Sequence, residues 1–294
     1  MKFPIKLNRA YWPPSMTKML PSAVDPRILL YEDIEEKSFG SAISTFKFGP
    51  SFKSTQKTRF PLTILELATL AYPNRPIVLD IGASDGITSI DLMQAIPFEK
   101  YYVTDENVEI SYQISGDATW FYDDKGDCIL MATDKWVDYP DTGGAVFPFD
   151  RIVHSLFLHA PKLENNAPRI TLINPLFKTQ NKNNVLIEKY NILETWPYEK
   201  VDLIIAANIL DRGYFTASEI EHALNKLVAA LNDTGRIAII DHHSGEKATI
   251  FQFNDSGAKI IKRVNGGTEI ENLAFNIFSK VIQTALTNSA ARQV

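Results

Sequence analysis

Residues 76–86 combine the residue types that a nucleotide site needs. Ile77 to Ile81 form an almost continuous apolar run, which is typical of a strand buried on both faces of a parallel sheet. Gly82 and Gly86 follow, and glycine lets the backbone turn tightly because it has no Cβ atom. Apolar residues at helical spacing come next, so the free N–H groups of a helix start point into the turn. The stretch therefore predicts a strand, a glycine turn and a helix that together bind a nucleotide-like ligand.

An acidic residue stands at the distance that such a site requires. Residues 100–105 predict a second strand that ends in Asp105, which lies 19 residues beyond Gly86. A carboxylate at the end of this strand accepts hydrogen bonds from the two ribose hydroxyls, and nucleotide sites place it roughly 20 residues after the glycine turn. Asp105 is therefore the predicted ribose ligand.

The residues of the turn distinguish three kinds of protein. A dinucleotide-binding Gly-x-Gly-x-x-Gly pattern fails, because Ser84 replaces its second glycine and Ile87 its third. The stretch from Gly82 to Gly86 does match the Gly-x-Ser-x-Gly nucleophile elbow of α/β-hydrolases. The longer pattern Asp80-x-Gly82-x-Ser84-x-Gly86 resembles the first motif of class I S-adenosylmethionine (SAM) dependent methyltransferases, with serine in place of the middle glycine.

The methyltransferase resemblance covers residues 76–110 and 185–265, and it implies a set of cofactor ligands. In that family Asn191, after the third strand, would accept a bond from adenine N6, Ile192 would pack on the adenine face, and Asn208 would end the fourth strand beside the methyl group. The SAM-binding residues that the resemblance implies are Asp80, Gly82, Ala83, Ser84, Gly86, Asp105, Asn191, Ile192 and Asn208.

The predicted function is transfer of a methyl group from SAM to an oxygen or nitrogen atom of a small organic acceptor. Where the acceptor must lose a proton, His242 and His243 after the fifth strand are the candidate bases, since the histidine pKa suits that task. Asp211 and Tyr214 are lesser candidates. The alternatives are a serine hydrolase that uses Ser84 and a non-catalytic scaffold with a SAM-type fold.

The order of the predicted helices and strands indicates an α/β fold. We expect a doubly wound, mostly parallel seven-stranded sheet that is closed by an antiparallel hairpin. Beyond the first two strands, the predicted elements are a helix that begins at Asp25-Pro26 and ends at Gly40, a helix at 62–70, strands at 185–190, 201–208 and 236–241, a helix opened by a capping box at Thr216, a hairpin at 248–264, and a helix or strand at 271–286.

Three regions are expected. Residues 1–75 form an N-terminal arm and helical lid, residues 76–106 and 181–294 the SAM-binding core, and residues 107–180 an inserted cap with a hairpin at 119–131. A helix is predicted at 149–159, where His154 and His159 are five residues apart and so do not share a helix face that could bind a metal. The arm and the cap, both rich in aromatic residues, are expected to cover the methyl-transfer site and to select the acceptor.

Composition excludes several classes of protein. The chain has 294 residues, 45% of them hydrophobic, and a net charge of -5, so it lacks the basic surface of a duplex nucleic-acid binder. No apolar run is long enough to cross a bilayer. The first residues, Met1 to Lys6, lack the apolar core of a secretory signal, and the single Cys128 cannot form an internal disulfide, so a cytoplasmic protein is expected. The expected partner is a small or lipid-like acceptor. Residues 1–24, basic and aromatic, leave peripheral membrane contact open. No metal ion and no particular oligomeric state is expected.

Overall fold

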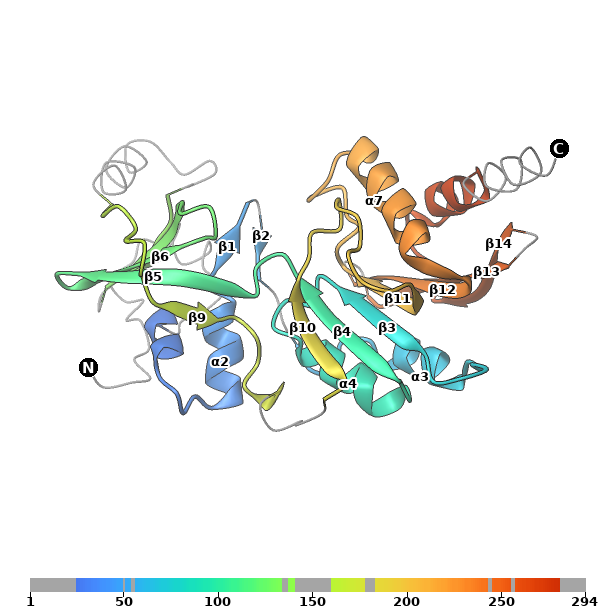
Figure 1. The fold of residues 1–294 in the computed structure, drawn as a ribbon, viewed down its shortest axis with the longest axis horizontal. Coiled ribbons are helices and arrows are strands. Elements are labelled where there is room, and N and C mark those ends of the chain that lie inside the picture. The colour runs from blue at the N-terminus through green and yellow to red at the C-terminus, as the bar shows by residue number, and fades with distance from the viewer. Residues whose placement is uncertain are drawn as a thin grey trace. The chain divides into compact units, whose positions relative to one another are not determined.

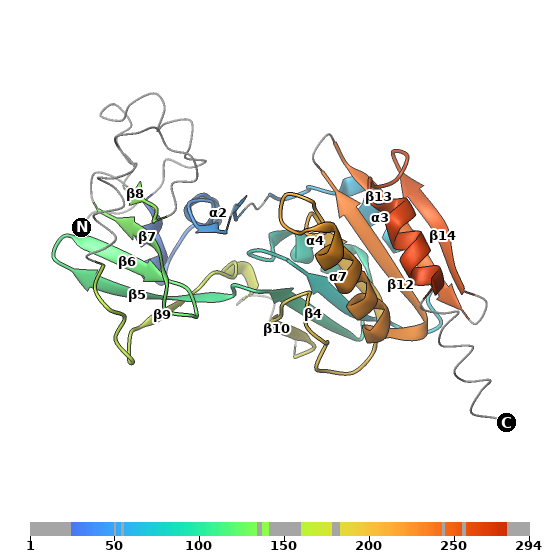
Figure 2. The ribbon, with the colours of Figure 1, turned by 90° about the horizontal axis from the view of Figure 1, so that it is seen from above.

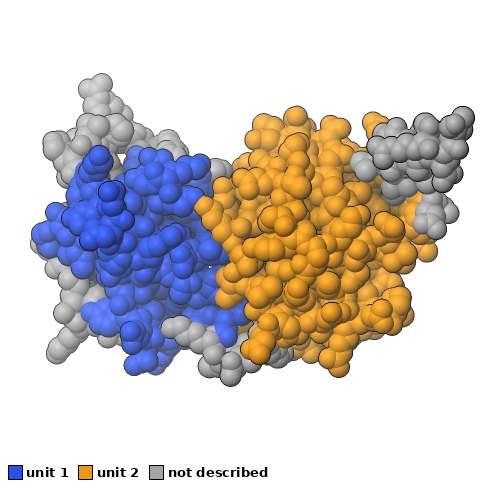
Figure 3. Space-filling view, viewed as in Figure 1, with its two compact units in different colours: residues 1–56, 107–181 blue, residues 57–106, 182–294 orange. Residues whose placement is uncertain are grey.

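The computed structural model describes residues 25–49, 51–53, 56–133, 137–140, 160–177, 183–242, 245–254 and 257–280. The chain divides into two compact units, shown in different colours in Figure 3. Unit 1 comprises residues 1–56 and 107–181, and unit 2 comprises residues 57–106 and 182–294. The expected arm at 1–24 and the expected helix at 149–159 lie outside the described residues.

Unit 2 contains a seven-stranded sheet in the order β10-β4-β3-β11-β12-β13-β14. The first five strands in this order are parallel, and β13 runs antiparallel to both of its neighbours. The strands are β3 (Ile77–Ile81), β4 (Lys100–Asp105), β10 (Val185–Lys189), β11 (Val201–Ala207), β12 (Leu231–Asp241), β13 (Lys247–Asn254) and β14 (Gly257–Val264). The predicted fold class is confirmed, because the sheet is mostly parallel and ends in an antiparallel hairpin.

Helices cover both faces of this sheet (Figures 1 and 2). On one face lie α7 (Ala217–Ala230) and a helix at residues 271–280, whose apolar side chains join one core cluster with Leu79 and Ile81 of β3. On the other face lie α3 (Pro61–Thr69) and α4 (Ile87–Ala95). Successive side chains of a strand point to opposite faces of the sheet, and helices cover both faces. Nearly every side chain of a strand is therefore buried, which explains why the strands are near-continuous apolar runs.

The local sequence signal at the start of α7 is confirmed. The Thr216 hydroxyl and the Glu219 carboxylate form the predicted capping box at the start of α7. Of the segment 271–286, predicted as helix or strand, residues 271–280 are helical and the rest lies outside the described residues.

The strand predicted at 236–241 begins earlier in the structure, because β12 already starts at Leu231. Leu231 pairs with Val201, and the pairing resumes only at Arg236 opposite Leu203, so residues 232–235 bulge out of an already formed strand.

Unit 1 has its own antiparallel sheet, in the order β8-β7-β6-β5-β9. Its strands are β5 (Glu109–Ser115), β6 (Ala118–Tyr122), β7 (Cys128–Ala132), β8 (Val137–Asp138) and β9 (Arg169–Thr171), and a separate two-stranded pair joins β1 (Lys47–Phe48) to β2 (Ser51–Phe52). The predicted hairpin at 119–131 is confirmed by the β6–β7 pairing. Helix α2 (Glu36–Ile43) packs its buried face into the core that this sheet forms.

The prediction of one helix from Pro26 to Gly40 is wrong. The chain forms a short 3-10 helix, η2 (Pro26–Leu30), then an exposed bend, and then α2, in which Gly40 is an interior residue. Phe39, Ala42 and Ile43 are buried in the core of unit 1, and this packing outweighs the low helix propensity of glycine. None of the helices among the described residues combines the length and the apolar character that crossing a bilayer requires.

Candidate functional site

The order of strands in unit 2 defines where a ligand is expected. From β3 the chain moves outward to β4 and β10, and then returns to the other side of β3 with β11 and β12. The direction of winding therefore changes between β3 and β11. In open α/β sheets the crevice beyond the carboxyl ends of the two strands at such a point is the usual ligand site. Residues 82–86 follow β3 and residues 208–212 follow β11, so both segments border this crevice.

The turn after β3 has the tight, left-handed backbone conformation that its glycines predict. Gly82, Ser84 and Gly86 all have positive φ angles, of 68°, 59° and 81°. The Ala83 N–H donates to the Thr104 carbonyl at 2.9 Å, which ties the turn to β4. A Cβ atom on Gly82 would lie only 2.6 Å from Cδ1 of Ile209, so glycine is needed here for space as well as for conformation.

Asp105 meets this turn, as predicted. Its carboxylate Oδ2 accepts a hydrogen bond of 2.9 Å from the backbone N–H of Ser84. The half-buried carboxylate is thus held beside the turn at the end of β4. Asp105, which lies 19 residues beyond Gly86, thus contacts the turn directly, and a ribose placed at the turn would find the acceptor that its hydroxyls need.

The Asp80 side chain, unlike that of Asp105, does not contact the turn but lies buried beneath α4. Its side chain points to the α4 face, where Oδ2 accepts hydrogen bonds from the Ser89 hydroxyl at 2.6 Å and the Tyr101 hydroxyl at 3.0 Å. The residue is 3% exposed, and burial raises the pKa of its carboxyl to about 6 although both hydrogen bonds lower it. Asp80 therefore supports the turn from within the protein, and its carboxylate links β3 to β4 and α4.

Asn191 and Ile192 follow β10, as expected, and both side chains already have partners within the protein. The Asn191 side-chain oxygen accepts from the Leu193 N–H at 2.9 Å, and its amide nitrogen donates to Glu106 at 3.2 Å. Ile192 is 2% exposed and belongs to the core cluster of unit 2. The oxygen of an amide has two lone pairs, so a further bond from a ligand is compatible with the turn that Asn191 forms.

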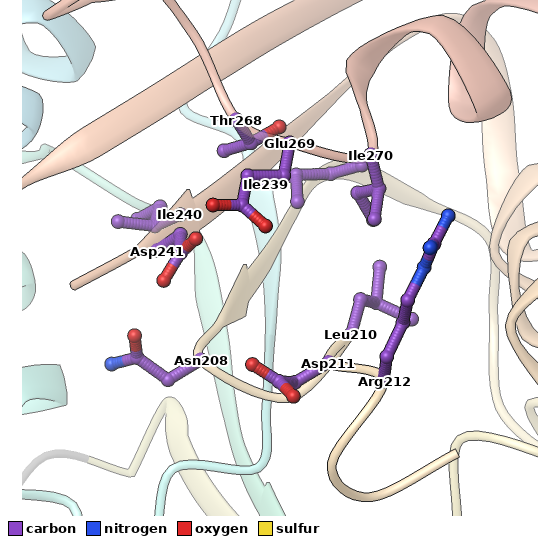
Figure 4. Close-up of a pocket in the computed structure, with 10 residues that line it drawn as sticks. All are labelled: Asn208, Leu210, Asp211, Arg212, Ile239, Ile240, Asp241, Thr268, Glu269 and Ile270. Atoms are coloured by element: carbon purple, nitrogen blue, oxygen red, sulfur yellow. The ribbon is translucent and has the colours of Figure 1, made fainter. Parts of the chain in front are cut away.

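A cavity of about 220 Å³ lies beyond the carboxyl ends of β11 and β12 (Figure 4). Asn208 stands at its edge with a φ angle of 52°, and its N–H donates to the Ile240 carbonyl at 2.8 Å. Its side-chain oxygen Oδ1 is buried and has no hydrogen-bond partner in the part of the chain that the structure describes. The residues that line the cavity are Asn208, Leu210, Asp211, Arg212, Ile239, Ile240, Asp241, Thr268, Glu269 and Ile270.

The described histidine among the candidate bases lies against α3. The His242 ring packs edge-to-face on Phe60, with 5.9 Å between centroids, and His242 is not among the residues that line the cavity. His243 lies outside the described residues. Glu246, from the same loop, accepts hydrogen bonds from the Leu62 and Thr63 N–H groups at 3.1 and 2.5 Å and so caps the start of α3.

Structural comparison finds methyltransferases. The N-methyltransferase NodS from Bradyrhizobium japonicum, in complex with S-adenosyl-L-homocysteine, matches with a TM-score of 0.32 and 13% identity over 60% of this chain and 58% of that one. The mitomycin 7-O-methyltransferase MmcR matches with a TM-score of 0.33 and 11% identity over 62% of this chain and 36% of that one. The SAM-dependent methyltransferase SibL matches with a TM-score of 0.33 and 14% identity over 61% and 35%.

These matches span less than two thirds of each known structure. No family model matches the sequence, and no curated protein matches it. At TM-scores this low the likeness defines neither activity nor substrate. The fold assignment rests on the strand order and on the turn of unit 2.

Two parts of the site were missed from the sequence. Asp241 ends β12, so the sheet-edge rule that predicts Asp105 as a ligand also points to Asp241. Thr268 and Glu269 follow β14 and carry no local signal of a site. Of the lesser base candidates, Asp211 lines the cavity, whereas Tyr214 is 44% exposed and does not line it.

Proposed function

We propose that this chain is a SAM-dependent methyltransferase that transfers a methyl group to an oxygen or nitrogen atom of a small organic acceptor. The observation that carries the proposal is the hydrogen bond from the Ser84 N–H to the Asp105 carboxylate, which joins the end of β4 to the turn after β3, next to the point where the winding of the sheet changes direction. A left-handed glycine turn and an acid on the adjoining strand meet there, which is the arrangement that a nucleoside ligand requires.

The residues at this place suit an adenosyl ligand. Asp105 supplies charged acceptors for ribose hydroxyls, the turn at 82–86 presents backbone N–H groups, and Asn191 supplies an amide beyond β10. Asn208 adds a buried acceptor that lacks a partner among the described residues. The close packing of Gly82 on Ile209 joins the turn to the segment that borders the cavity.

The chemistry asks little of the protein beyond orientation. SAM, when bound, supplies a methyl carbon made electrophilic by its sulfonium. The chain must hold the acceptor in line with the carbon–sulfur bond and exclude water, which is catalysis by proximity and orientation. In this proposal Asp105 and the turn hold the nucleoside, Asp80 keeps the turn in place through Ser89 and Tyr101, and the segment after β11 faces the acceptor.

Isothermal titration calorimetry with SAM and with S-adenosyl-L-homocysteine tests this function. Asp105→Ala should weaken binding of either ligand by about 1–3 kcal/mol, because the ribose hydroxyls lose a charged acceptor, and Asp105→Asn should cost less. Asp233→Asn is the matched control, since this acid is 91% exposed in another part of unit 2 and should leave affinity unchanged. If the wild type binds SAM and Asp105→Ala binds it with the same affinity, Asp105 is not the ribose ligand.

Two other outcomes separate the alternatives. Absence of binding with both ligands, together with labelling of Ser84 by a fluorophosphonate, would favour the serine hydrolase. Of the two described histidines, His222 lies at 3.0 Å from the Leu193 carbonyl and His242 packs on Phe60, so neither contact brings a base to Ser84. Tight SAM binding without methyl transfer to any acceptor would favour the scaffold.

A further inference from the structure

We propose that Arg59 binds the carboxylate of the methyl acceptor, so that the acceptor is a small organic acid. This inference rests on the proposed function, because that function defines the ligand as an acceptor, but the binding of an acid can be tested without methyl transfer. Three features of unit 2 support it: the position of Arg59, its lack of an anionic partner and the groups around it.

Arg59 lies at the carboxyl edge of the sheet in unit 2. The residue before it, Thr58, donates its backbone N–H to the Asp91 carboxylate of α4 at 2.8 Å. The residue after it, Phe60, packs on the ring of His242, which comes directly after β12. This short segment thus joins α4, which begins at the glycine turn after β3, to the end of β12. It therefore runs along the edge of the sheet that borders the ligand crevice.

The Arg59 guanidinium is half-buried and has no anionic partner among the described residues. Its Cζ atom lies over the Phe60 ring, 5.5 Å from the centroid, a contact that leaves its N–H donors available. Burial lowers the pKa of Arg59, an effect that the nearby Tyr214 phenol opposes, and no carboxylate of the described chain contributes. A cation that loses part of its water is normally paired with an acid, so a ligand carboxylate would supply the missing partner.

The groups around Arg59 suit an organic acid. The planar guanidinium presents parallel N–H donors that match both oxygens of a carboxylate. Tyr214 is 44% exposed, and its hydroxyl can donate a further hydrogen bond. The Phe60, Tyr214 and His242 rings give this place an aromatic character, which favours an acid with an apolar or aromatic body.

The order of the strands separates Arg59 from the nucleoside end of the site. The proposed nucleoside ligands Asp105 and Asn191 lie at the ends of β4 and β10, on one side of β3. Arg59 lies near Tyr214 and His242, which follow β11 and β12 on the other side of β3. The acid therefore belongs to the acceptor. Its carboxylate serves as an anchor, and the methyl group goes to another oxygen or nitrogen atom of the same molecule.

Ligand-observed NMR titrations of the full chain, with S-adenosyl-L-homocysteine present, test the inference with acids and their matched amides. Benzoate is compared with benzamide, and phenylacetate with phenylacetamide, because each amide keeps the shape of the acid without its charge. We expect each acid to bind at least about tenfold more tightly than its amide.

Variants of Arg59 show whether this residue causes the preference. Arg59→Gln should weaken binding of both acids about tenfold and leave the amides unchanged. Arg59→Lys keeps the charge but loses the planar fork, so its affinity for the acids should fall between the two. Arg75→Gln is the matched control, because it removes an exposed arginine just before β3, at the opposite edge of the sheet, and should change nothing.

Tyr214→Phe is a second test that leaves the buried segment before α3 intact. It removes one hydroxyl and should weaken binding of the acids severalfold without affecting the amides. Failure of both acids to bind the wild type at millimolar concentration overturns the inference. Equal affinity for acids and amides, or affinity for the acids that Arg59→Gln and Arg59→Lys leave unchanged, overturns it as well.

A third arm separates the acceptor from the carboxylate of the cofactor itself. 5′-Methylthioadenosine lacks the amino-acid part of S-adenosyl-L-homocysteine, and we expect Arg59→Gln to bind both nucleosides with the affinity of the wild type. If the variant binds S-adenosyl-L-homocysteine more weakly but 5′-methylthioadenosine equally well, Arg59 holds the cofactor, and the assignment to the acceptor is overturned.

The two proposals can fail independently. Binding of S-adenosyl-L-homocysteine without binding of the acids leaves the methyltransferase function standing and removes the organic acid. Acid binding that depends on Arg59, in a protein that binds neither SAM nor its product, confirms the carboxylate site but overturns the proposed function and the role of the acid as methyl acceptor.

Discussion

Replacing Gly82 with alanine tests the contact between the turn after β3 and the segment after β11. The φ angle of Gly82 is 68°, a conformation that costs a residue with a Cβ atom roughly 1–2 kcal/mol. The new Cβ would also lie 2.6 Å from Cδ1 of Ile209 and 3.2 Å from its Cβ. Overpacking of this kind costs about 1–3 kcal/mol, so Gly82→Ala should destabilise unit 2 by about 2–5 kcal/mol in total.

Two further variants separate the backbone part of this cost from the steric part. Gly266→Ala introduces a Cβ at a φ angle of 87° with no atom within 4 Å, so it should show the conformational cost alone. Ile209→Ala removes Cδ1, the atom closest to the new methyl group, but keeps Cβ. The double variant of Gly82 and Ile209 should therefore be more stable than the sum of the single effects by about 1 kcal/mol.

Urea denaturation of the wild type and these variants, followed by fluorescence and linear extrapolation, gives the required free energies of unfolding. The reasoning fails in either of two cases. If the effects of Gly82→Ala and Ile209→Ala add within about 0.5 kcal/mol, the close approach is not an energetic contact. If Gly82→Ala costs no more than Gly266→Ala, the turn has room that the structure does not show.

Three further predictions concern the supports of the site. Burial raises the pKa of Asp80 to about 6, above its ordinary value, so native Asp80 keeps a proton that the unfolded chain has lost, and stability should fall by on the order of 3 kcal/mol as the pH rises from 4 to 7. Asp80→Asn should lack this fall in urea titrations, and identical pH profiles would contradict the assignment. Glu246→Ala should speed hydrogen exchange at Leu62 and Thr63 and destabilise by about 1–2 kcal/mol, whereas Glu246→Gln should do so less. Thr216→Ala should lower stability by about 1 kcal/mol through loss of the α7 cap, and an unchanged denaturation midpoint would mean that the cap is frayed.

Much of unit 2 could be predicted because its local signals agree with its packing. The apolar runs became β3, β4, β10 and β11, and the capping box at Thr216 begins α7. The prediction of a helix from Pro26 to Gly40 was wrong because α2 continues past Gly40, where Ala42 and Ile43 pack with Phe39 into the core of unit 1, and no local pattern shows this packing.

The cavity was harder to predict than the turn. The residues of the turn are contiguous, and the distance to Asp105 follows from one crossover through α4. Asp241 and Glu269, in contrast, are separated by the β13–β14 hairpin, and only the return of the chain after β14 places both at one cavity. Without the strand order, nothing in the sequence relates them. A cluster formed by such distant segments requires the tertiary structure.

Asp80 and Asp105 show why residue type alone does not assign a role in such a site. Asp80 lies inside β3, opposite Val103 of β4, and the pleat turns its side chain to α4, where Ser89 and Tyr101 bind it. Asp105 ends β4, beyond the last residue paired with β3, so its carboxylate can reach the Ser84 N–H. One acid should therefore control stability and its pH dependence, and the other should control nucleoside affinity. If Asp80→Asn weakened S-adenosyl-L-homocysteine binding as strongly as Asp105→Ala, without changing the pH profile of stability, this division of roles would be wrong.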